Sequence, residues 1–284
     1  MLWNLMNLPF YYRKLLPIYK ARSFISIMSG GRTKPWLVLV ETDNYGIQPY
    51  VMKLFDTINL DARDHVTAEV IGHVLAGEFD FDVPEAAFIE IDEDFLSTIQ
   101  DGELLRTIEH KDSRLKFASA LVDGNQLFSS GLAKKDAEKM LDIQTLFAFD
   151  NFIRNRDRNN HKPNMLVKAD ELFLIDHEMG LELDSSTISD FRAGNWDNRF
   201  IDYHVFRDYL YNATERAKAK YFGTFEEYLR GLNLNKLDPY FRQLNDLGYS
   251  DDRHSMIKDY FEEIKNNSTK FVNLLKQGIN EKGN

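Results

Sequence analysis

Three polar residues in the middle of the chain have the types and spacing of a site that binds a hard cation and moves a proton. Asp157 lies in a polar loop, Asn164 ends that loop, and Asp176 follows a short apolar run. Magnesium prefers oxygen ligands and usually takes one or two protein groups, with water and substrate phosphates completing its shell. Asn164 and Asp176 would supply those groups, and Asp157 is a carboxylate that can accept the proton of an attacking hydroxyl. The pattern predicts phosphoryl-transfer chemistry with one carboxylate as base.

A β-hairpin is expected to bring the two magnesium ligands together. The residue pattern predicts strands at 165–168 and 172–175. The index sum of facing residues is constant in an antiparallel pair, so a turn centred on Asp170 places Asn164 opposite Asp176. Facing Cβ atoms lie about 4.5–5.5 Å apart, close enough for both side chains to reach one cation.

Positive charge surrounds Asp157 in a chain whose formal net charge is −10. Arg154, Arg156, Arg158 and Lys162 flank the base, so a phosphate-rich substrate is expected to be drawn to this loop. These arginines could equally form ion pairs that stabilise the loop. Arg158 is singled out as a catalytic candidate because it follows the base directly.

Asp150 is the one charged residue on an otherwise apolar helix face, between Phe147 and Ile153. An unpaired charge would be costly there, so Asp150 is expected to have a buried partner. We expect it to organise the backbone of the loop that follows rather than to take part in the chemistry.

The elements that position these residues fall into two parts. The first part is expected to be a small sheet with one helix: strands at 36–40, 49–55 and 86–91, and a helix at 63–77 with valines every four residues. The segment 92–132 has no clear pattern except for a candidate strand at 115–122.

The second part is expected to be mostly helical. An amphipathic helix is predicted at 134–155, the hairpin follows it, and helical patterns fill the chain from residue 198 onward. The fold class is therefore α+β.

The loop residues resemble a known family. The runs 149–158 (FDNFIRNRDR), 163–166 (PNML) and 174–177 (LIDH) resemble the catalytic and metal loops of short HipA-like kinases, which are similar in plan to protein kinases and phosphatidylinositol kinases. In ordinary protein kinases the base and the metal-binding Asn are closer than the seven positions from Asp157 to Asn164. The longer interval, which contains a Pro-Asn pair, matches the short HipA-like branch. The resemblance covers about residues 20–180.

The resemblance implies a two-lobed, protein-kinase-like fold around a cleft. It places a small β-rich N-lobe with one helix at 21–95 and a larger, mostly helical C-lobe at 96–284. The C-lobe contains the catalytic loop at 155–164, the hairpin and the metal loop at 175–180. Residues 1–20 are then an N-terminal extension, expected to be helical.

The resemblance also implies a nucleotide site in the first part of the chain. Gly30 and Gly31 precede the first predicted strand and look like the family's glycine-containing nucleotide loop. Lys53 looks like the strand lysine that holds the α- and β-phosphates of ATP. Glu69, sixteen residues later in the helix, would be its ion-pair partner. Taken alone, Lys53 could be an exposed strand lysine and Glu69 a solvated helix charge.

Two positions depart from the family pattern. Glu178 stands where the family usually has Gly, and Gly180 follows two positions later. Ala68 stands where Asn is expected. A side chain at 178 could change the flexibility of the metal loop or add a carboxylate to it.

The function implied by the resemblance is transfer of the γ-phosphoryl group of ATP, with Mg²⁺, to a hydroxyl, with Ser or Thr of a protein as the expected acceptor. The alternatives are an inactive nucleotide-binding regulatory module, and a kinase-fold enzyme that acts on a lipid or a small molecule or transfers a nucleotidyl group. The implied partners are a protein substrate and an antitoxin or other regulatory protein.

The amino-acid composition excludes several kinds of site and disfavours one class of partner. The 284 residues are 43% hydrophobic, enough for a sizeable core, and none is Cys, which excludes disulfides, zinc-thiolate sites and a Cys nucleophile. A reducing compartment, the cytoplasm, is expected. The net charge of −10 disfavours nucleic acid as a partner. The apolar start at 1–12 has no basic residue, and Asn4, Asn7 and Pro9 interrupt it, so neither a secretory signal nor a membrane span is expected.

Binding of a magnesium nucleotide should stabilise the folded chain. At a ligand concentration about 100 times Kd, linkage adds roughly 2.7 kcal/mol to the free energy of unfolding, which corresponds to several degrees in Tm. Differential scanning fluorimetry with Mg-ATP or Mg-ADP checks this, and EDTA should remove most of the shift. No shift at millimolar nucleotide with magnesium would contradict a nucleotide site.

Overall fold

The protein has a mixed α+β fold of two compact units. The computed structural model describes residues 15–28, 34–58, 60, 64–129, 134–249 and 253–281. The predicted glycines of the nucleotide loop, Gly30 and Gly31, lie outside the described residues, and so do residues 1–14 of the expected extension. The described remainder of that extension is not helical, because a strand begins at Ile18.

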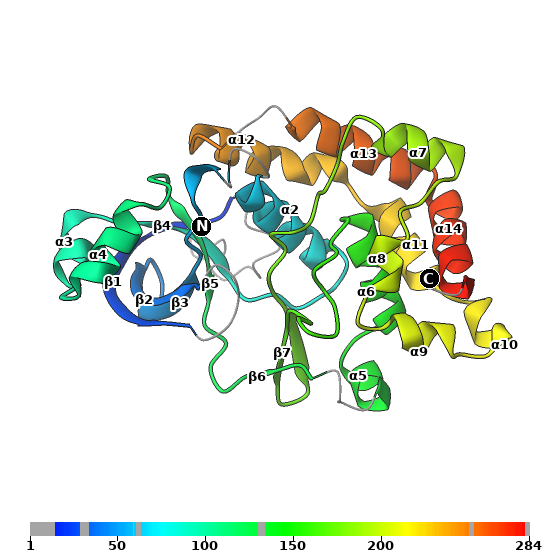
Figure 1. Ribbon diagram of the computed structural model, residues 1–284, viewed down its shortest axis with the longest axis horizontal. Helices are drawn as coiled ribbons and strands as arrows, with labels where there is room; N and C mark the ends of the chain where they lie inside the picture. The colour runs from blue at the N-terminus through cyan, green and yellow to red at the C-terminus, as the bar shows by residue number, and fades with distance from the viewer. Residues whose placement is uncertain are drawn as a thin grey trace, which may run out of the picture. The chain divides into compact units, whose positions relative to one another are not determined.

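Unit 1 comprises Met1–Val70, Pro84–Asp123 and Pro239–Ser250. Its centre is a closed barrel with the strand order β1-β2-β3-β5-β4 (Figure 1). Neighbouring strands are antiparallel except at the closure, where β1 and β4 run parallel. The strands are β1 (Ile18–Ile27), β2 (Trp36–Thr42), β3 (Gly46–Met52), β4 (Ala86–Glu90) and β5 (Lys116–Ala120).

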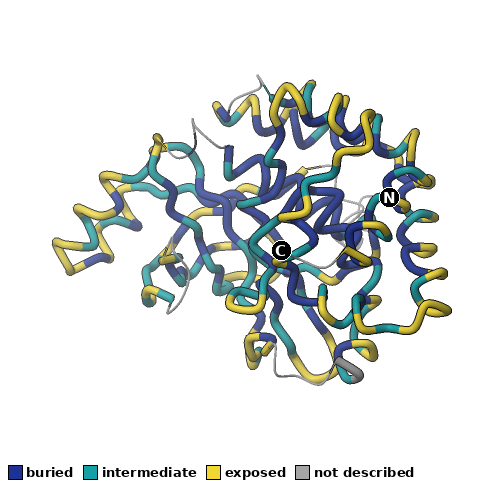
Figure 2. Tube along the Cα trace, turned by 45° about the vertical axis from the view of Figure 1, so that its right-hand side comes forward, coloured by how far each residue is buried: buried dark blue, intermediate teal, exposed yellow. Residues whose placement is uncertain are grey.

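The burial of successive residues alternates along β2 and β3, because their side chains point in turn to the inside and the outside of the barrel. Trp36, Val38, Tyr50 and Met52 are buried in the barrel core, and the residues between them are less buried. Figure 2 shows the chain coloured by the burial of its residues. Strands were predicted at 36–40 and 49–55, and β3 ends earlier than expected, at Met52.

Two short helices complete the core of unit 1. Asp92 caps α3 (Glu93–Ser97) and Asp101 caps α4 (Gly102–Glu109), each by accepting a backbone N–H bond. They bury Phe95 and Ile108 in the same cluster as the barrel residues. Both helices lie in the segment 92–132, for which the sequence had no clear pattern. The capping aspartates were the available signal in a segment without clear periodicity.

Unit 1 also differs in extent from the predicted N-lobe, which ended at residue 95. β5 belongs to it because this strand pairs with both β3 and β4. Unit 1 also contains α12 (Asp238–Asp246) from Pro239 onward. Gln243 of this helix exchanges two hydrogen bonds with the backbone of Leu16, at 3.0 and 2.7 Å. Chain order alone could not show this contact.

Unit 2 comprises Ile71–Val83, Gly124–Asp238 and Asp251–Asn284. Its central helix, α6 (Ile143–Phe152), is buried on all sides, and aromatic rings pack around Phe152, including Phe225, Phe261 and Phe271. The single helix predicted at 134–155 is in fact two, because Asp142 caps α6 and separates it from α5 (Lys134–Met140).

A three-stranded sheet in unit 2 consists of β6 (Gln126–Leu127), β7 (Met165–Lys168) and β8 (Glu171–Leu174). The hairpin was predicted correctly, but its register was not. Met165 faces Leu174 and Lys168 faces Glu171, so the connection has two residues, and Ala169 adopts a φ of +53°. Asn164 therefore lies opposite Ile175 rather than Asp176, and the Ile175 N–H donates to the Asn164 carbonyl.

The remaining elements are helical, and those after residue 198 lie where a helical pattern was predicted. One is α2 (His65–Glu78), which confirms the predicted helix at 63–77; its residues divide between the two units after Val70. The others are α7 (Thr187–Ala193), α8 (Arg199–Asp202), α9 (Arg207–Tyr211), α10 (Glu215–Lys218), α11 (Gly223–Gly231), η2 (Leu234–Leu237), α13 (His254–Asn266) and α14 (Ser268–Asn280). Within the described residues, no helix has both the length and the apolar character needed to cross a membrane.

Burial of His73 in α2 predicts loss of stability in mild acid. Burial lowers the pKa of the His73 ring from 6.5 to about 3. Below pH 6.5 the unfolded chain therefore binds a proton that the folded chain does not, and the free energy of unfolding falls by up to about 1.4 kcal/mol per pH unit from this group. Urea unfolding between pH 7 and 4 should show a shallower loss for His73→Phe than for wild type.

The matched control is His110→Gln, a change of an exposed histidine at the end of α4. It is the reference for the general effect on stability of replacing a histidine over the same pH range. Equal pH slopes for wild type and His73→Phe would contradict the assignment of a neutral, buried His73.

Candidate active site

Asp150 is the buried carboxylate to which the polar loop is attached. Its side chain is fully buried in α6, and both oxygens accept hydrogen bonds. Oδ1 accepts from Asn155 at 3.2 Å, and Oδ2 accepts from Arg158 at 2.6 Å and from His204 at 3.1 Å. Burial alone would raise the pKa of Asp150, but the Arg158 charge and the His204 hydrogen bond hold it below its ordinary value. The predicted buried partner of Asp150 is confirmed.

Arg158 ties this carboxylate to the far end of the loop. Its side chain is buried, and besides its bond to Asp150 it donates from Nη1 to the backbone carbonyl of Asn164 at 2.5 Å and to that of Pro163 at 3.2 Å. A side chain held inside the protein in this way does not touch a substrate. The interpretation of Arg158 as catalytic is therefore corrected: it positions Asn164.

A second connection runs from Asp150 to the predicted base. Asn155 donates to Asp150, and its own Oδ1 accepts the backbone N–H of Asp157 at 3.1 Å. The side chain of Asp157 remains 21% exposed, so its carboxylate is held by the loop and is still accessible. An accessible carboxylate on a fixed backbone is available to a substrate hydroxyl, as the predicted role of Asp157 as a base requires.

Lys162 lies between two of the predicted site residues. Its Nζ is 2.7 Å from Asp157 Oδ2 and 3.3 Å from Asp176 Oδ2. Burial alone would lower the pKa of the Lys162 ammonium, but Asp176 and Asp157 raise it above its ordinary value. This spot therefore stabilises positive charge. The sequence analysis counted Lys162 among the surrounding charges but gave it no specific contact.

Asn164 and Asp176 both lie near Asp157, although they are not the facing pair that the predicted register gave. Both residues adopt left-handed backbone conformations, with φ of +51° and +62°, just outside the paired strands. Asn and Asp tolerate this conformation better than most residues. Asn164 donates from Nδ2 to Asp157 Oδ2 at 3.3 Å, and Asp176 lies beside Lys162.

The predicted metal ligands are of types that fit a hard divalent cation. Magnesium accepts both a carboxylate, such as that of Asp176, and an amide oxygen, such as that of Asn164, and the Asp176 carboxylate already lies beside an ammonium group. Glu178 is buried, and its carboxylate lies within 4.8 Å of that of Asp176. The departure from the family pattern at this position thus adds negative charge next to a predicted metal ligand.

Lys53 and Glu69 pair within unit 1. The Lys53 backbone N–H donates to Phe117 in β5 at 3.0 Å, which extends the alternation of β3 by one residue and puts Lys53 on the outward side with Val51. Its ammonium forms a hydrogen-bonded ion pair with Glu69, whose side chain is only 2% exposed. The expected pairing is confirmed, and the alternatives of an exposed lysine and a solvated glutamate are excluded.

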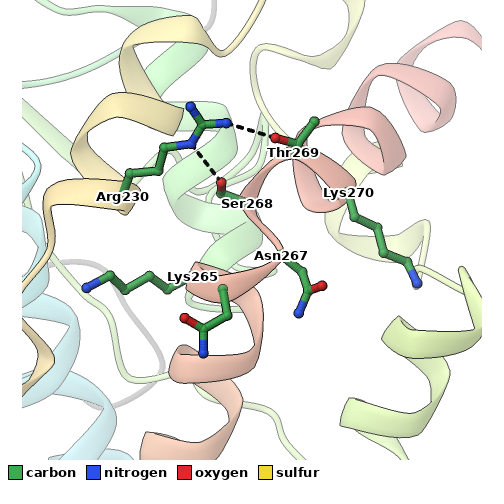
Figure 3. A pocket seen from close by; sticks show the side chains of 7 residues that line it. Arg230, Lys265, Asn267, Ser268, Thr269 and Lys270 are labelled. Atoms are coloured by element: carbon green, nitrogen blue, oxygen red, sulfur yellow. Dashed lines mark hydrogen bonds between the residues drawn. The ribbon is translucent and has the colours of Figure 1, made fainter.

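A hollow of about 520 Å³ lies elsewhere in unit 2, where α13 meets α14 (Figure 3). It contains Arg230, Lys265 and Lys270, but the three cations bind different protein groups. Arg230 donates to Glu226, Ser268 and Thr269, Lys265 to the Leu232 carbonyl, and Lys270 to the Arg192 carbonyl. Figure 3 shows the two lysines pointing in different directions. Because its cations do not converge, this hollow is not the candidate site.

Comparisons with known proteins identify the family to which the sequence is similar. A family model described as HipA-like kinase matches residues 22–234, three quarters of the chain. No curated protein matches the sequence. Among solved structures, the fold is similar to that of CtkA, described as a proinflammatory kinase of Helicobacter pylori, with 10% sequence identity, coverage of 93% of this chain and 98% of that chain, and a TM-score of 0.44.

The buried pair in unit 1 predicts a strong energetic coupling. Lys53→Met leaves the Glu69 charge without its ammonium partner, and adding Glu69→Gln removes that charge, so the double variant should recover part of the lost stability. Urea unfolding of the four chains should give a coupling of about 1–3 kcal/mol. Lys53→Met should also weaken Mg-nucleotide binding.

The exposed pair Lys20–Glu90, 3.8 Å apart in the same unit, is the matched control. The corresponding cycle with Lys20→Met and Glu90→Gln should give a coupling below about 0.5 kcal/mol. Similar coupling energies in the two cycles would mean that Lys53 and Glu69 are an ordinary surface pair.

Proposed function

Because the chain belongs to the HipA-like kinase family, we propose that it transfers the γ-phosphoryl group of Mg-ATP to a hydroxyl, with a Ser or Thr side chain of a protein as the acceptor. In this proposal the two compact units are the small and large lobes of a protein-kinase-like fold.

The observation that carries the proposal is the clustering of the three predicted site residues. The Lys162 ammonium lies between the Asp157 and Asp176 carboxylates, and Asn164 donates a hydrogen bond to Asp157. Phosphoryl transfer needs little covalent chemistry from the protein, so positioning and charge neutralisation do most of the catalysis. A loop that holds an accessible carboxylate next to two oxygen ligands supplies both. A structural turn would not need Asp150 and Arg158 buried beneath it to fix the backbone.

In the proposed reaction each residue has a separate task. Asp157 orients the acceptor hydroxyl and accepts its proton as the new bond to phosphorus forms. Asn164 and Asp176 would hold Mg²⁺, which neutralises charge on the phosphates when bound. Lys162 balances the negative charge of Asp157 and Asp176, and its ammonium is a further positive group at this spot.

Unit 1 supports nucleotide binding through one face of its barrel. Lys53 extends from the outward side of β3, on the same side as Val51, which faces Leu37 across the β2–β3 pair. Val51 and Leu37 are partly buried and apolar, in contrast to the fully buried residues on the inner side. An apolar strip beside a lysine suits a purine ring with attached phosphates, and Lys53 would hold the α- and β-phosphates, as the family pattern implies.

The second candidate function is a regulatory module that binds nucleotide without turnover. The observation that favours it is the buried Glu178, which brings a second carboxylate close to Asp176 and changes the charge around the metal ligand. The two functions differ in one measurable respect, because only the enzyme needs the charge of Asp157.

Two substitutions separate the enzyme from the regulatory module. Asp157→Asn keeps the shape of the base but removes its charge, so Mg-ATP binding should stay within about threefold of wild type while phosphotransfer falls by about 10²-fold or more. Asp176→Asn removes a charged ligand and should impair both. Titration calorimetry with Mg-ATP and transfer from labelled ATP to proteins of a lysate measure the two properties.

Asp170→Asn, in the exposed turn of the hairpin, is the control with the same change of charge. It should match wild type in both assays. The catalytic assignment fails if wild type binds Mg-ATP, labels no acceptor, and cannot be distinguished from Asp157→Asn.

A further inference from the structure

A segment far along the chain lies against the catalytic loop. Residues 203–206 connect α8 to α9, and His204 forms an antiparallel bridge with Asn159. The Val205 N–H donates to the Arg158 carbonyl at 3.0 Å. These backbone contacts hold the segment beside the two residues that follow Asp157.

The His204 ring is fixed in one tautomer by its two neighbours. The Phe206 N–H donates to Nδ1 at 3.1 Å, so Nδ1 is the acceptor nitrogen and Nε2 carries the proton. Nε2 then donates to Asp150 Oδ2 at 3.1 Å. Burial lowers the pKa of His204, although the Asp150 hydrogen bond opposes this. Its edge-to-face contact with Phe147, with centroids 4.8 Å apart, fixes its orientation.

The Asp150 carboxylate, held by His204, is connected by hydrogen bonds to both ends of the loop. Through Oδ1 it holds Asn155, which binds the backbone of Asp157. Through Oδ2 it holds Arg158, which binds the carbonyl of Asn164. Rotation of the Asp150 carboxylate would disturb both connections at once.

We propose that His204 is a positioning residue for phosphotransfer, which fixes the Asp150 carboxylate and thereby the backbone of the base and of the predicted metal ligand. Asn155 and Arg158 belong to the loop itself and move with it. His204 reaches Asp150 from 54 positions further along the chain, so it is an anchor from outside the loop. The catalytic part of this inference rests on the proposed function, and the structural part does not.

Substitutions at His204 test whether its hydrogen-bond donor matters. His204→Gln retains an N–H group that can reach Asp150, and His204→Leu removes it. Hydrogen–deuterium exchange of the full chain, followed over residues 155–164, should be about tenfold or more faster in His204→Leu and within about threefold of wild type in His204→Gln. In phosphotransfer assays kcat should fall by about tenfold or more in the Leu variant, while KM for ATP changes by less than about threefold.

The matched control is Tyr221→Phe, which removes another buried hydrogen bond of the same unit, from the Tyr221 hydroxyl to the Leu210 carbonyl. It should leave exchange in residues 155–164 unchanged. If His204→Leu does not fold, His204→Asn replaces it, because the shorter amide does not extend to the Nε2 position, and His204→Gln should still outperform it.

The proposal is overturned if the Gln variant behaves like Leu or Asn. It is also overturned if His204→Leu accelerates exchange equally throughout unit 2, because His204 would then be an ordinary core residue. Absence of phosphotransfer in wild type would count against the proposed function, while the exchange data would still decide whether His204 positions the loop.

Discussion

The organisation of the site depends on one buried charge, the Asp150 carboxylate. It sits in the most buried helix of unit 2, where an uncompensated charge would be strongly destabilising, and it is satisfied by Asn155, Arg158 and His204. Two of these donors belong to the loop. Asp150 is paired with these donors only when the loop adopts one particular conformation. The burial of Asp150 therefore orders the loop residues 155–164.

In the accessible part of the site, the charges to be compensated are those of neighbouring carboxylates. Asp157 and Asp176 place negative charge close together, and Lys162 compensates it at 2.7 and 3.3 Å. Glu178 adds a further carboxylate near Asp176. The buried network fixes the backbone through the Asp150–Arg158 ion pair and the hydrogen bonds from Asn155 and His204. In the accessible part, acidic oxygens gather around a cation, as the proposed binding of a metal–phosphate group requires.

Local sequence signals were sufficient for the features that depend on neighbouring residues. The barrel strands after β1, the helix around Glu69 and the position of the hairpin could be predicted, and the charge of Asp150 on an apolar face indicated a buried partner. β1 was not predicted, because its first residues fell in the extension that was expected to be helical. The register of the hairpin could not be predicted, because one residue more or less in the turn shifts every facing pair. The two-residue turn depends on a left-handed Ala169, a conformation that its residue type does not signal.

Features that depend on long-range contacts were missed for a related reason. No local pattern showed that His204 would meet Asp150, or that Gln243 would return to Leu16. Arg158 was assigned to catalysis because of its place after the base, whereas its direction, into the protein, is decided by Asp150. Sequence order predicted candidate reacting groups, and only the fold separates the candidates that face solvent from the side chains that hold them in place.

The most direct test of the central claim is to locate the metal–nucleotide complex on the protein. Manganese substitutes for magnesium at oxygen-ligand sites and broadens the NMR signals of nearby nuclei. With Mn²⁺ and ATP added to labelled protein, the account predicts selective broadening of the amide signals around Asp157, Asn164 and Asp176, with the signals around Arg230 and Thr269 unaffected. Broadening centred on the α13–α14 hollow, or no selective broadening at saturating nucleotide, would contradict it.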